Sequence, residues 1–170
     1  MSYEFATECG LSKDRIHNIA ESVAELLNYE PGDDLEPVVL GLGGGLFSVG
    51  DDEFDVTVDG SIRVDAPANF QIYVAEYSGP LRSRFTIAHE LGHYFLHFDP
   101  DLGPMKAARY GTGRVEWEAN WFAAGFLMPE TKFRGALDAA DGYLMDVSSE
   151  FRVSLSAAEI RAKNLGLDVA

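Results

Sequence analysis

Residues 84–97 have the sequence RFTIAHELGHYFLH, which lies within a helix predicted over residues 81–98 and places a row of histidines along one face. His89 and His93 are four residues apart, so on a helix their Cβ atoms lie about 5–6 Å from each other. Two imidazoles placed in this way can bind one zinc ion at Zn–N distances of roughly 2.0–2.1 Å. Glu90 lies beside the ion, where its carboxylate can take a proton from a water molecule and pass it to a leaving amine. The stretch therefore predicts a hydrolytic site with one Zn²⁺ per chain.

A catalytic zinc ion needs a third protein ligand and one open position. The best donor is Glu116, which belongs to a helix predicted over residues 114–128. Asn120 is four residues further on and shares a face with Glu116, so its amide can hydrogen-bond one of the histidine ligands. Glu118 is rotated by about 200° from Glu116 around the helix. We therefore expect Glu118 to be a solvated acid, and we keep it as the reserve for the third ligand.

The rest of the chain predicts an α+β domain that spans residues 1–170. Strands are expected in three stretches rich in β-branched and aromatic residues, and a loop follows the metal helix over residues 99–113. Helices are expected on both sides of this region, with Ser12 as the N-cap of the first. The strand ranges are 46–49, 56–64 and 70–75, and the other helix ranges are 12–28, 35–42, 131–137, 143–151 and 154–165. This order favours a small, mostly antiparallel sheet with helices packed on one face, as in zincins, and with the HExxH motif on the central helix.

The composition excludes several classes of protein. The chain has 13 basic and 28 acidic residues and a formal net charge of −15, which disfavours direct binding to nucleic acid. No apolar run approaches the roughly 18 residues that a membrane span requires. Cys9 is the only cysteine, and residues 1–11 do not have the pattern of a secretory signal, so a reducing cytoplasmic setting is expected.

Two blocks of this sequence together resemble the ImmA/IrrE metallopeptidases. The first is Arg84–His97, and the second runs from Glu116 to Pro129 as Glu-x-Glu-Ala-Asn-x-Phe-Ala-Ala-x-Phe-Leu-Met-Pro. The resemblance implies a small gluzincin-like fold in which His89, His93 and Glu116 bind zinc and Glu90 is the general base. It also implies a partner, a helix-turn-helix repressor of the XRE type, whose cleavage relieves repression in a stress response or in mobile-element control. IrrE-type members carry further domains, whereas these residues resemble the peptidase unit alone, so the repressor is expected to be a separate protein.

Weaker assignments concern the surroundings of the metal. A neutral donor such as Tyr73 or His97 could assist catalysis, although His97 is equally well explained as a packed residue at the helix end. The stretch from Phe70 to Tyr73 is either an edge strand that aligns an extended peptide beside the zinc or an ordinary part of the sheet. Trp117 lies at helical spacing from other aromatic residues, which favours the core over contact with substrate.

Two alternatives to proteolysis remain at this stage. The chain could be a regulatory module that binds metal and repressor with little or no proteolysis, because a metal site indicates binding more directly than turnover. It could also bind DNA through residues 151–161, which resemble part of a helix-turn-helix. The basic residues there are few, among them Arg152 and Arg161, so this second alternative is disfavoured. Val153, Leu155, Ile160 and Leu165 are instead expected in the core.

Overall fold

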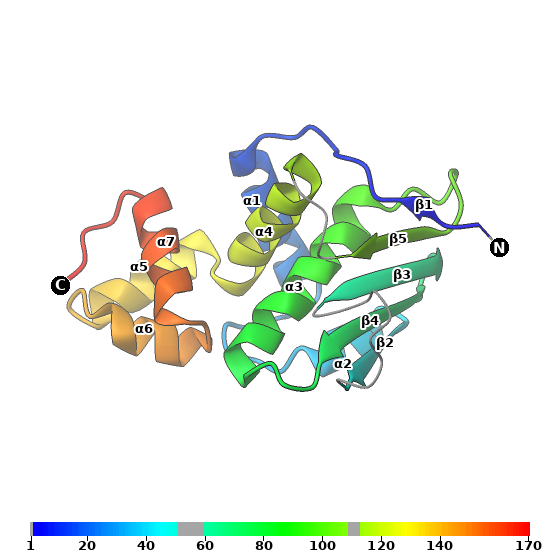
Figure 1. Cartoon of the computed structure of the whole chain (residues 1–170). Coiled ribbons are helices and arrows are strands. Elements are labelled where there is room, and N and C mark those ends of the chain that lie inside the picture. Colours follow the sequence, from blue (N-terminus) through cyan, green and yellow to red (C-terminus); the bar gives the residue numbers. More distant parts are fainter. Residues whose placement is uncertain (1, 51–59, 109–112) are drawn as a thin grey trace.

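A mixed sheet and a set of helices make up the fold in the computed structural model, which describes residues 2–50, 60–108 and 113–170. Figure 1 shows the sheet at one end of the molecule and the last three helices at the other. The strands, in the order in which they lie in the sheet, are β1 (Glu4–Phe5), β5 (Met105–Ala108), β3 (Ser61–Ala66), β4 (Asn69–Ala75) and β2 (Gly44–Val49). The helices are α1 (Lys13–Leu26), α2 (Glu36–Gly41), α3 (Pro80–His97), α4 (Arg114–Leu127), α5 (Glu130–Ala139), α6 (Leu144–Phe151) and α7 (Leu155–Asn164).

The α+β class is confirmed, but the sheet is mixed rather than mostly antiparallel. β3 pairs antiparallel with both of its neighbours, β4 and β5, whereas β2 pairs parallel with β4 and β1 pairs parallel with β5. β3 and β4 follow each other through a tight turn, which enforces antiparallel pairing. β1 and β2 reach the sheet from separate parts of the chain, and their own sequences do not reveal their direction.

The largest differences from the expected elements lie at the outer strands. β5 falls inside residues 99–113, which were predicted to be a loop because glycine and proline are frequent there. β1 has only two residues and was not foreseen. Residues 56–59 of the strand expected over 56–64, and residues 109–112 of the expected loop, lie outside the described part of the chain.

The place of β4 in the sheet bears on two predictions, that Phe70–Tyr73 forms an edge strand and that Tyr73 assists catalysis. Because β4 is hydrogen-bonded to β2 on one side and to β3 on the other, the proposal that Phe70–Tyr73 forms an edge strand is wrong. Phe70 is buried toward α3 and packs on the ring of Tyr94, with ring centroids 4.4 Å apart. Side chains alternate between the faces of a strand, so Tyr73 lies on the opposite face, where it stacks on Phe47 with centroids 5.6 Å apart.

α4 packs between α3 and α1, and glycines allow close contact on both sides (Figure 1). A Cβ atom at Gly92 of α3 would lie 3.0 Å from the Cβ atom of Phe122 and 3.1 Å from the Cα atom of Ala119. A Cβ atom at Gly125 of α4 would lie 2.9 Å from the backbone oxygen of His17 on α1. Phe122 is fully buried, whereas Trp117, which was expected in the core, is 57% exposed.

The last helices are fastened to the rest of the molecule by a buried arginine. Arg161 of α7 is 1% exposed and donates hydrogen bonds to the backbone oxygen of Met128, at 2.9 Å, and to Glu21, at 3.0 Å. This side chain is therefore unavailable to a phosphate backbone, which removes a main support of the DNA-binding alternative. Val153 is buried as expected, whereas Ile160 is 58% exposed and was wrongly assigned to the core. Within the described ranges, no helix has the length and apolar character needed to cross a membrane.

Candidate metal centre

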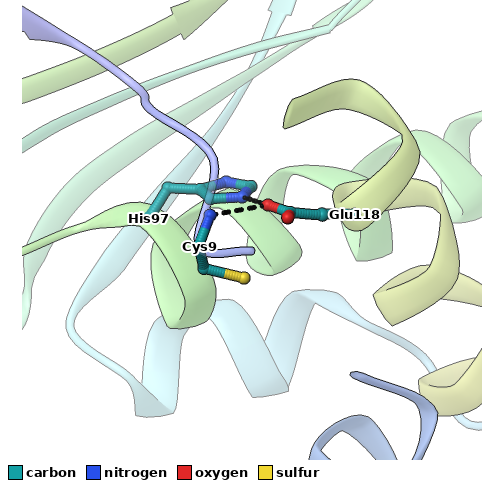
Figure 2. A group of neighbouring side chains, drawn as sticks. All are labelled: Cys9, His97 and Glu118. Carbon is teal, nitrogen blue, oxygen red and sulfur yellow. Dashed lines mark hydrogen bonds and ion pairs between the residues drawn. The ribbon is translucent and has the colours of Figure 1, made fainter. Parts of the chain in front are cut away.

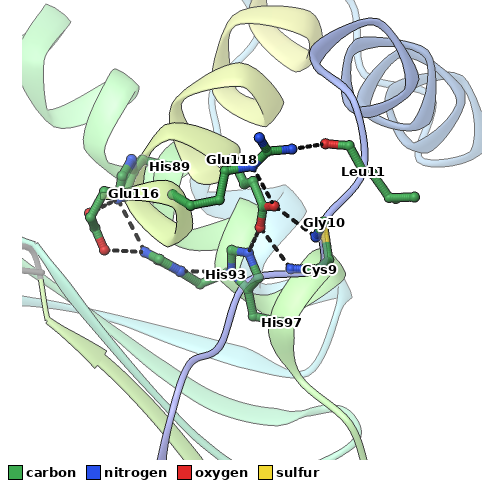
Figure 3. A network of polar contacts seen from close by, with 9 residues as sticks. Cys9, Gly10, Leu11, His89, His93, His97, Glu116 and Glu118 are labelled. Carbon is green, nitrogen blue, oxygen red and sulfur yellow. Dashed lines mark hydrogen bonds and ion pairs between the residues drawn. The ribbon is translucent and has the colours of Figure 1, made fainter. Parts of the chain in front are cut away.

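Three potential ligand side chains converge between α3 and α4. His89 Nε2 lies 2.9 Å from Glu116 Oε2, and His93 Nε2 lies 3.2 Å from Glu116 Oε1. The two Nε2 atoms are 3.2 Å apart, and one ligand atom of each of the three residues falls within 4.8 Å of the others. Figure 3 shows both imidazoles of α3 turned toward the carboxylate of α4. The structure thus brings together the three residues that the sequence proposes as metal ligands.

Local helix geometry and helix packing produce this convergence together. The four-residue spacing of His89 and His93 places both rings on one face of α3. Gly92 lies between them and lets the backbone of α4 approach, since any larger side chain there would press on Ala119 and Phe122. Glu116, in the first turn of α4, then reaches both rings.

Asn120 holds the first of the two imidazoles. Its Oδ1 atom lies 2.8 Å from His89 Nδ1, and an amide oxygen can only accept a hydrogen bond. His89 Nδ1 must therefore carry the proton. The lone pair of Nε2 then remains free and points toward the place where His93 and Glu116 also converge. This is the arrangement that orients a histidine ligand in zinc sites.

The electrostatics of the site suit a cation. Burial alone would raise the pKa of Glu116, but its contacts with His89 and His93 lower that pKa to about 2, so the carboxylate is ionised at neutral pH. Burial lowers the pKa of His93 to about 4 and keeps this ring neutral. For His89, burial opposes protonation, but the Glu116 contact and the charge of Glu90 prevail and raise the pKa. A metal ion takes neutral imidazoles and ionised carboxylates as ligands and displaces such a proton when it binds.

Glu90 follows His89 on α3 and is fully buried. Its negative charge contributes to the raised pKa of His89. A buried acid that follows a potential metal ligand on a helix is a candidate for the general base.

Glu118 has a different role from the one expected. Its side chain is 0% exposed, so the interpretation as a solvated acid is wrong. Its carboxylate lies 2.8 Å from His97 Nε2 and accepts hydrogen bonds from backbone N–H groups of Cys9 and Gly10, each at 2.9 Å, and from Arg114 Nε at 3.0 Å. Burial would raise the pKa of Glu118, but these donors lower it to about 2. The N-terminal contacts join residues more than 100 positions apart, and no local sequence pattern indicates them.

The two weaker donor candidates do not line the metal centre. Tyr73 lies on the face of the sheet that points away from α3. The side chain of His97 is 0% exposed, and its two ring nitrogens contact His93 and Glu118. His97 is thus a packed residue at the helix end, the second of the two interpretations that the sequence left open, and it also contacts the candidate ligand His93.

The donor set fits zinc. Two imidazole nitrogens and one carboxylate oxygen are the ligands of a common catalytic zinc site, and they leave one coordination position open. A second group, Cys9, His97 and Glu118, also has one ligand atom each within 4.8 Å of the others (Figure 2). Among the described residues, these are the two groups whose chemistry and spacing could hold a metal ion.

Comparisons with known proteins show the family and the fold of this chain. The model of a peptidase family, M78, described as the IrrE N-terminal-like domain, matches residues 53–163, which include both α3 and α4. A solved structure described as a Mycobacterium tuberculosis transcriptional regulator is similar, with a TM-score of 0.58 and 20% sequence identity. The similarity covers 88% of this chain but 46% of that one, so the chain spans less than half the length of this relative. At such identity the likeness concerns the fold alone. A search of curated proteins gave no significant match.

Proposed function

The chain belongs to the IrrE N-terminal-like peptidase family, and from this premise we propose that it is a zinc-dependent endopeptidase that cleaves a helix-turn-helix transcriptional repressor. The repressor is of the XRE type, and its cleavage relieves repression in a stress response or in the control of a mobile element. The enzyme acts in the cytoplasm with one zinc ion per chain.

In this proposal, each residue of the site has a separate role in metal binding, ligand orientation or proton transfer. His89, His93 and Glu116 hold the ion, and Asn120 keeps the ring of His89 turned toward it. When bound, zinc lowers the pKa of water and polarises a peptide carbonyl. Glu90 accepts the proton of the attacking water and delivers it to the leaving amine.

One observation carries this proposal: three ligand atoms from two helices lie within 4.8 Å of one another, with a fully buried glutamate next to them in sequence. Incidental surface histidines would not bury both rings against an ionised carboxylate, because the burial of unpaired polar groups is costly. His89 is 4% exposed and His93 is 0% exposed.

The substrate class rests on the family resemblance and on charge. The related solved structure is described as a transcriptional regulator, which is compatible with a partner in gene control. A net charge of −15 favours encounter with a protein that has a basic surface, and a DNA-binding repressor has one.

The test is the digestion of a purified XRE-type repressor, encoded beside this protein, by zinc-loaded wild type and by Glu90→Gln. Wild type is expected to produce two fragments, identified by mass spectrometry, whereas Glu90→Gln keeps its zinc and leaves the repressor intact. Full cleavage by Glu90→Gln, or an intact repressor with zinc-loaded wild type, would contradict the proposal. Glu159→Gln, an exposed acid on α7, is the matched control.

The burial of the site favours a second candidate, a module that binds metal and repressor without proteolysis. The Glu116 side chain is only 12% exposed, so a peptide must displace part of the surroundings before it reaches the ligands. This candidate predicts that Glu90→Gln still relieves repression in cells while the repressor remains full-length on an immunoblot. Loss of both relief and cleavage in Glu90→Gln supports the peptidase.

A further inference from the structure

A series of hydrogen bonds leads from the candidate ligand His93 to the backbone of Cys9 and Gly10, near the start of the polypeptide (Figure 3). His93 Nδ1 lies 2.9 Å from His97 Nδ1, and His97 Nε2 lies 2.8 Å from Glu118 Oε2. All three side chains are at most 1% exposed, so water does not compete for these contacts.

The protons in this series of hydrogen bonds have one consistent arrangement when His93 binds metal through Nε2. Its Nδ1 atom then carries a proton and donates to His97 Nδ1, which must accept. The other nitrogen of His97 carries a proton in turn and donates to the carboxylate of Glu118. Each ring is held in one tautomer, and that of His93 is the one that leaves Nε2 free for the ion. His89 obtains the same tautomer from Asn120.

Glu118 is itself held in place by the N-terminal segment, residues 6–12, which connects β1 to α1. The backbone N–H groups of Cys9 and Gly10 donate to its two oxygens, and Arg114 donates to Oε1 from the same helix. Arg114 also donates to the backbone oxygen of Leu11, which fastens the segment a second time. Figure 3 shows the segment running alongside the last turn of α3 at this point.

The same residues could instead hold a second metal ion, because Cys9, His97 and Glu118 are close together. Their contacts argue against this use. Both oxygens of Glu118 already accept hydrogen bonds from N–H donors, and the Arg114 guanidinium, 3.0 Å from Oε1, would repel a cation. Figure 2 shows the hydrogen bond that the backbone nitrogen of Cys9 donates to Glu118.

We propose that Glu118, acting through His97, is a positioning residue for the metal ligand His93, and that the N-terminal segment holds Glu118 in place. This inference rests on the zinc site of the proposed function. Outer partners of metal-bound histidines fix the orientation of the ring, and their loss costs about 10–100-fold in metal affinity.

Two variants test the chain of hydrogen bonds. Glu118→Gln replaces the final acceptor by a neutral amide, and His97→Phe keeps a packed ring but removes both nitrogens. Zinc affinity, measured by competition with a chromogenic chelator, is expected to fall about 10–100-fold in each variant. If Glu118→Gln does not fold, as judged by circular dichroism, the zinc affinity of His97→Phe alone tests the positioning role.

A spectroscopic measurement distinguishes the loss of a specific contact to His93 from a general loss of order in the metal site. In the cobalt-substituted wild type, the Nδ1 proton of His93 is expected to give a paramagnetically shifted NMR signal that exchanges slowly with solvent. In His97→Phe this signal is expected to vanish through fast exchange, while the corresponding signal of His89, held by Asn120, persists. Zinc affinity within twofold of wild type in both folded variants, together with an unchanged His93 signal, would overturn the proposal.

Glu159→Gln, an exposed acid on α7, is the matched control and is expected to bind zinc with wild-type affinity. Cys9→Ala tests for a second metal site, because it removes the sulfur and keeps the backbone donor, and one zinc ion per chain is expected in this variant. Two ions per wild-type chain that fall to one in Cys9→Ala would show a second metal site in place of the positioning role. If wild type binds no zinc at all, the proposed function itself fails, whereas normal binding by wild type and by both test variants removes only the positioning role.

Discussion

Glu116 and Glu118 lie two positions apart on α4, yet their carboxylates serve different neighbours. Glu116 contacts the Nε2 atoms of both histidines proposed as metal ligands, whereas Glu118 contacts His97 and the backbone of the N-terminal segment. The helix rotates by about 200° over two residues, which sends the two side chains in different directions. One helix turn thus supplies both a proposed metal ligand and the group that positions another ligand.

Replacement of Glu116 by Gln is expected to weaken zinc binding by more than about 100-fold, beyond the loss that is usual for an outer partner. The amide has no charge to offset that of the ion, although it has nearly the same shape. Isothermal titration with zinc would measure the change. Glu159→Gln, which alters an exposed acid on α7, is expected to bind zinc like wild type, and equal affinities in all three proteins would refute the ligand assignment.

The close contact of α3 with α4 at Gly92 is expected to support both the stability of the protein and its zinc binding. Gly92→Val places three carbon atoms where a single Cβ would already lie 3.0 Å from Phe122. Overpacking of this kind destabilises a protein by about 1–3 kcal/mol, and separation of the two helices moves His93 away from Glu116. We expect a lower urea midpoint together with weaker zinc binding.

A glycine in open surroundings is the control. A Cβ atom at Gly135 of α5 would meet no atom of the described residues within 4 Å, so Gly135→Ala is expected to stabilise the helix by about 0.5–1 kcal/mol. A Gly92→Val protein as stable as wild type would show that α4 can move aside without cost.

The buried side chain of His17 is expected to make the folded protein less stable in mild acid. Burial, aided by the charge of Arg161, lowers its pKa to about 4, whereas an unfolded histidine titrates near 6.5. Between these values the unfolded chain binds the proton more readily, so the stabilisation is complete above pH 6.5 and is lost as the pH falls toward 4. His17→Gln should reduce the shift of the urea midpoint between pH 7 and pH 5. A shift identical to that of wild type would contradict this origin.

Arg161 is expected to be a structural residue. Arg161→Met removes the donor to the Met128 oxygen and the ion pair with Glu21, which keeps the backbone N–H of Glu130 as a donor. Removal of one partner of a buried ion pair costs about 3 kcal/mol or more. Thermal unfolding would detect this as a lower midpoint. Lys163→Met, an exposed change on the same helix, is expected to shift stability by less than about 0.5 kcal/mol. Weak effects from both substitutions would show that α7 is held by other contacts.

The sequence by itself determined the parts of this protein that depend on local geometry. Spacing along a helix sets which side chains share a face, so residues 84–97 and 114–128 were sufficient to propose His89, His93, Glu116 and Asn120 as one group. The N-cap at Ser12 and the helix that follows it were predicted for the same reason, and the structure confirms both.

Only the tertiary structure decided the features that join distant segments. Nothing local marks Cys9 and Gly10 as hydrogen-bond donors to Glu118, because the contacts join residues more than 100 positions apart. The face on which Tyr73 lies likewise depends on the neighbours of β4, which strand periodicity leaves open. Helix spacing is an intrinsic property of the backbone, whereas strand partners and long-range hydrogen bonds follow from the packing of the whole chain.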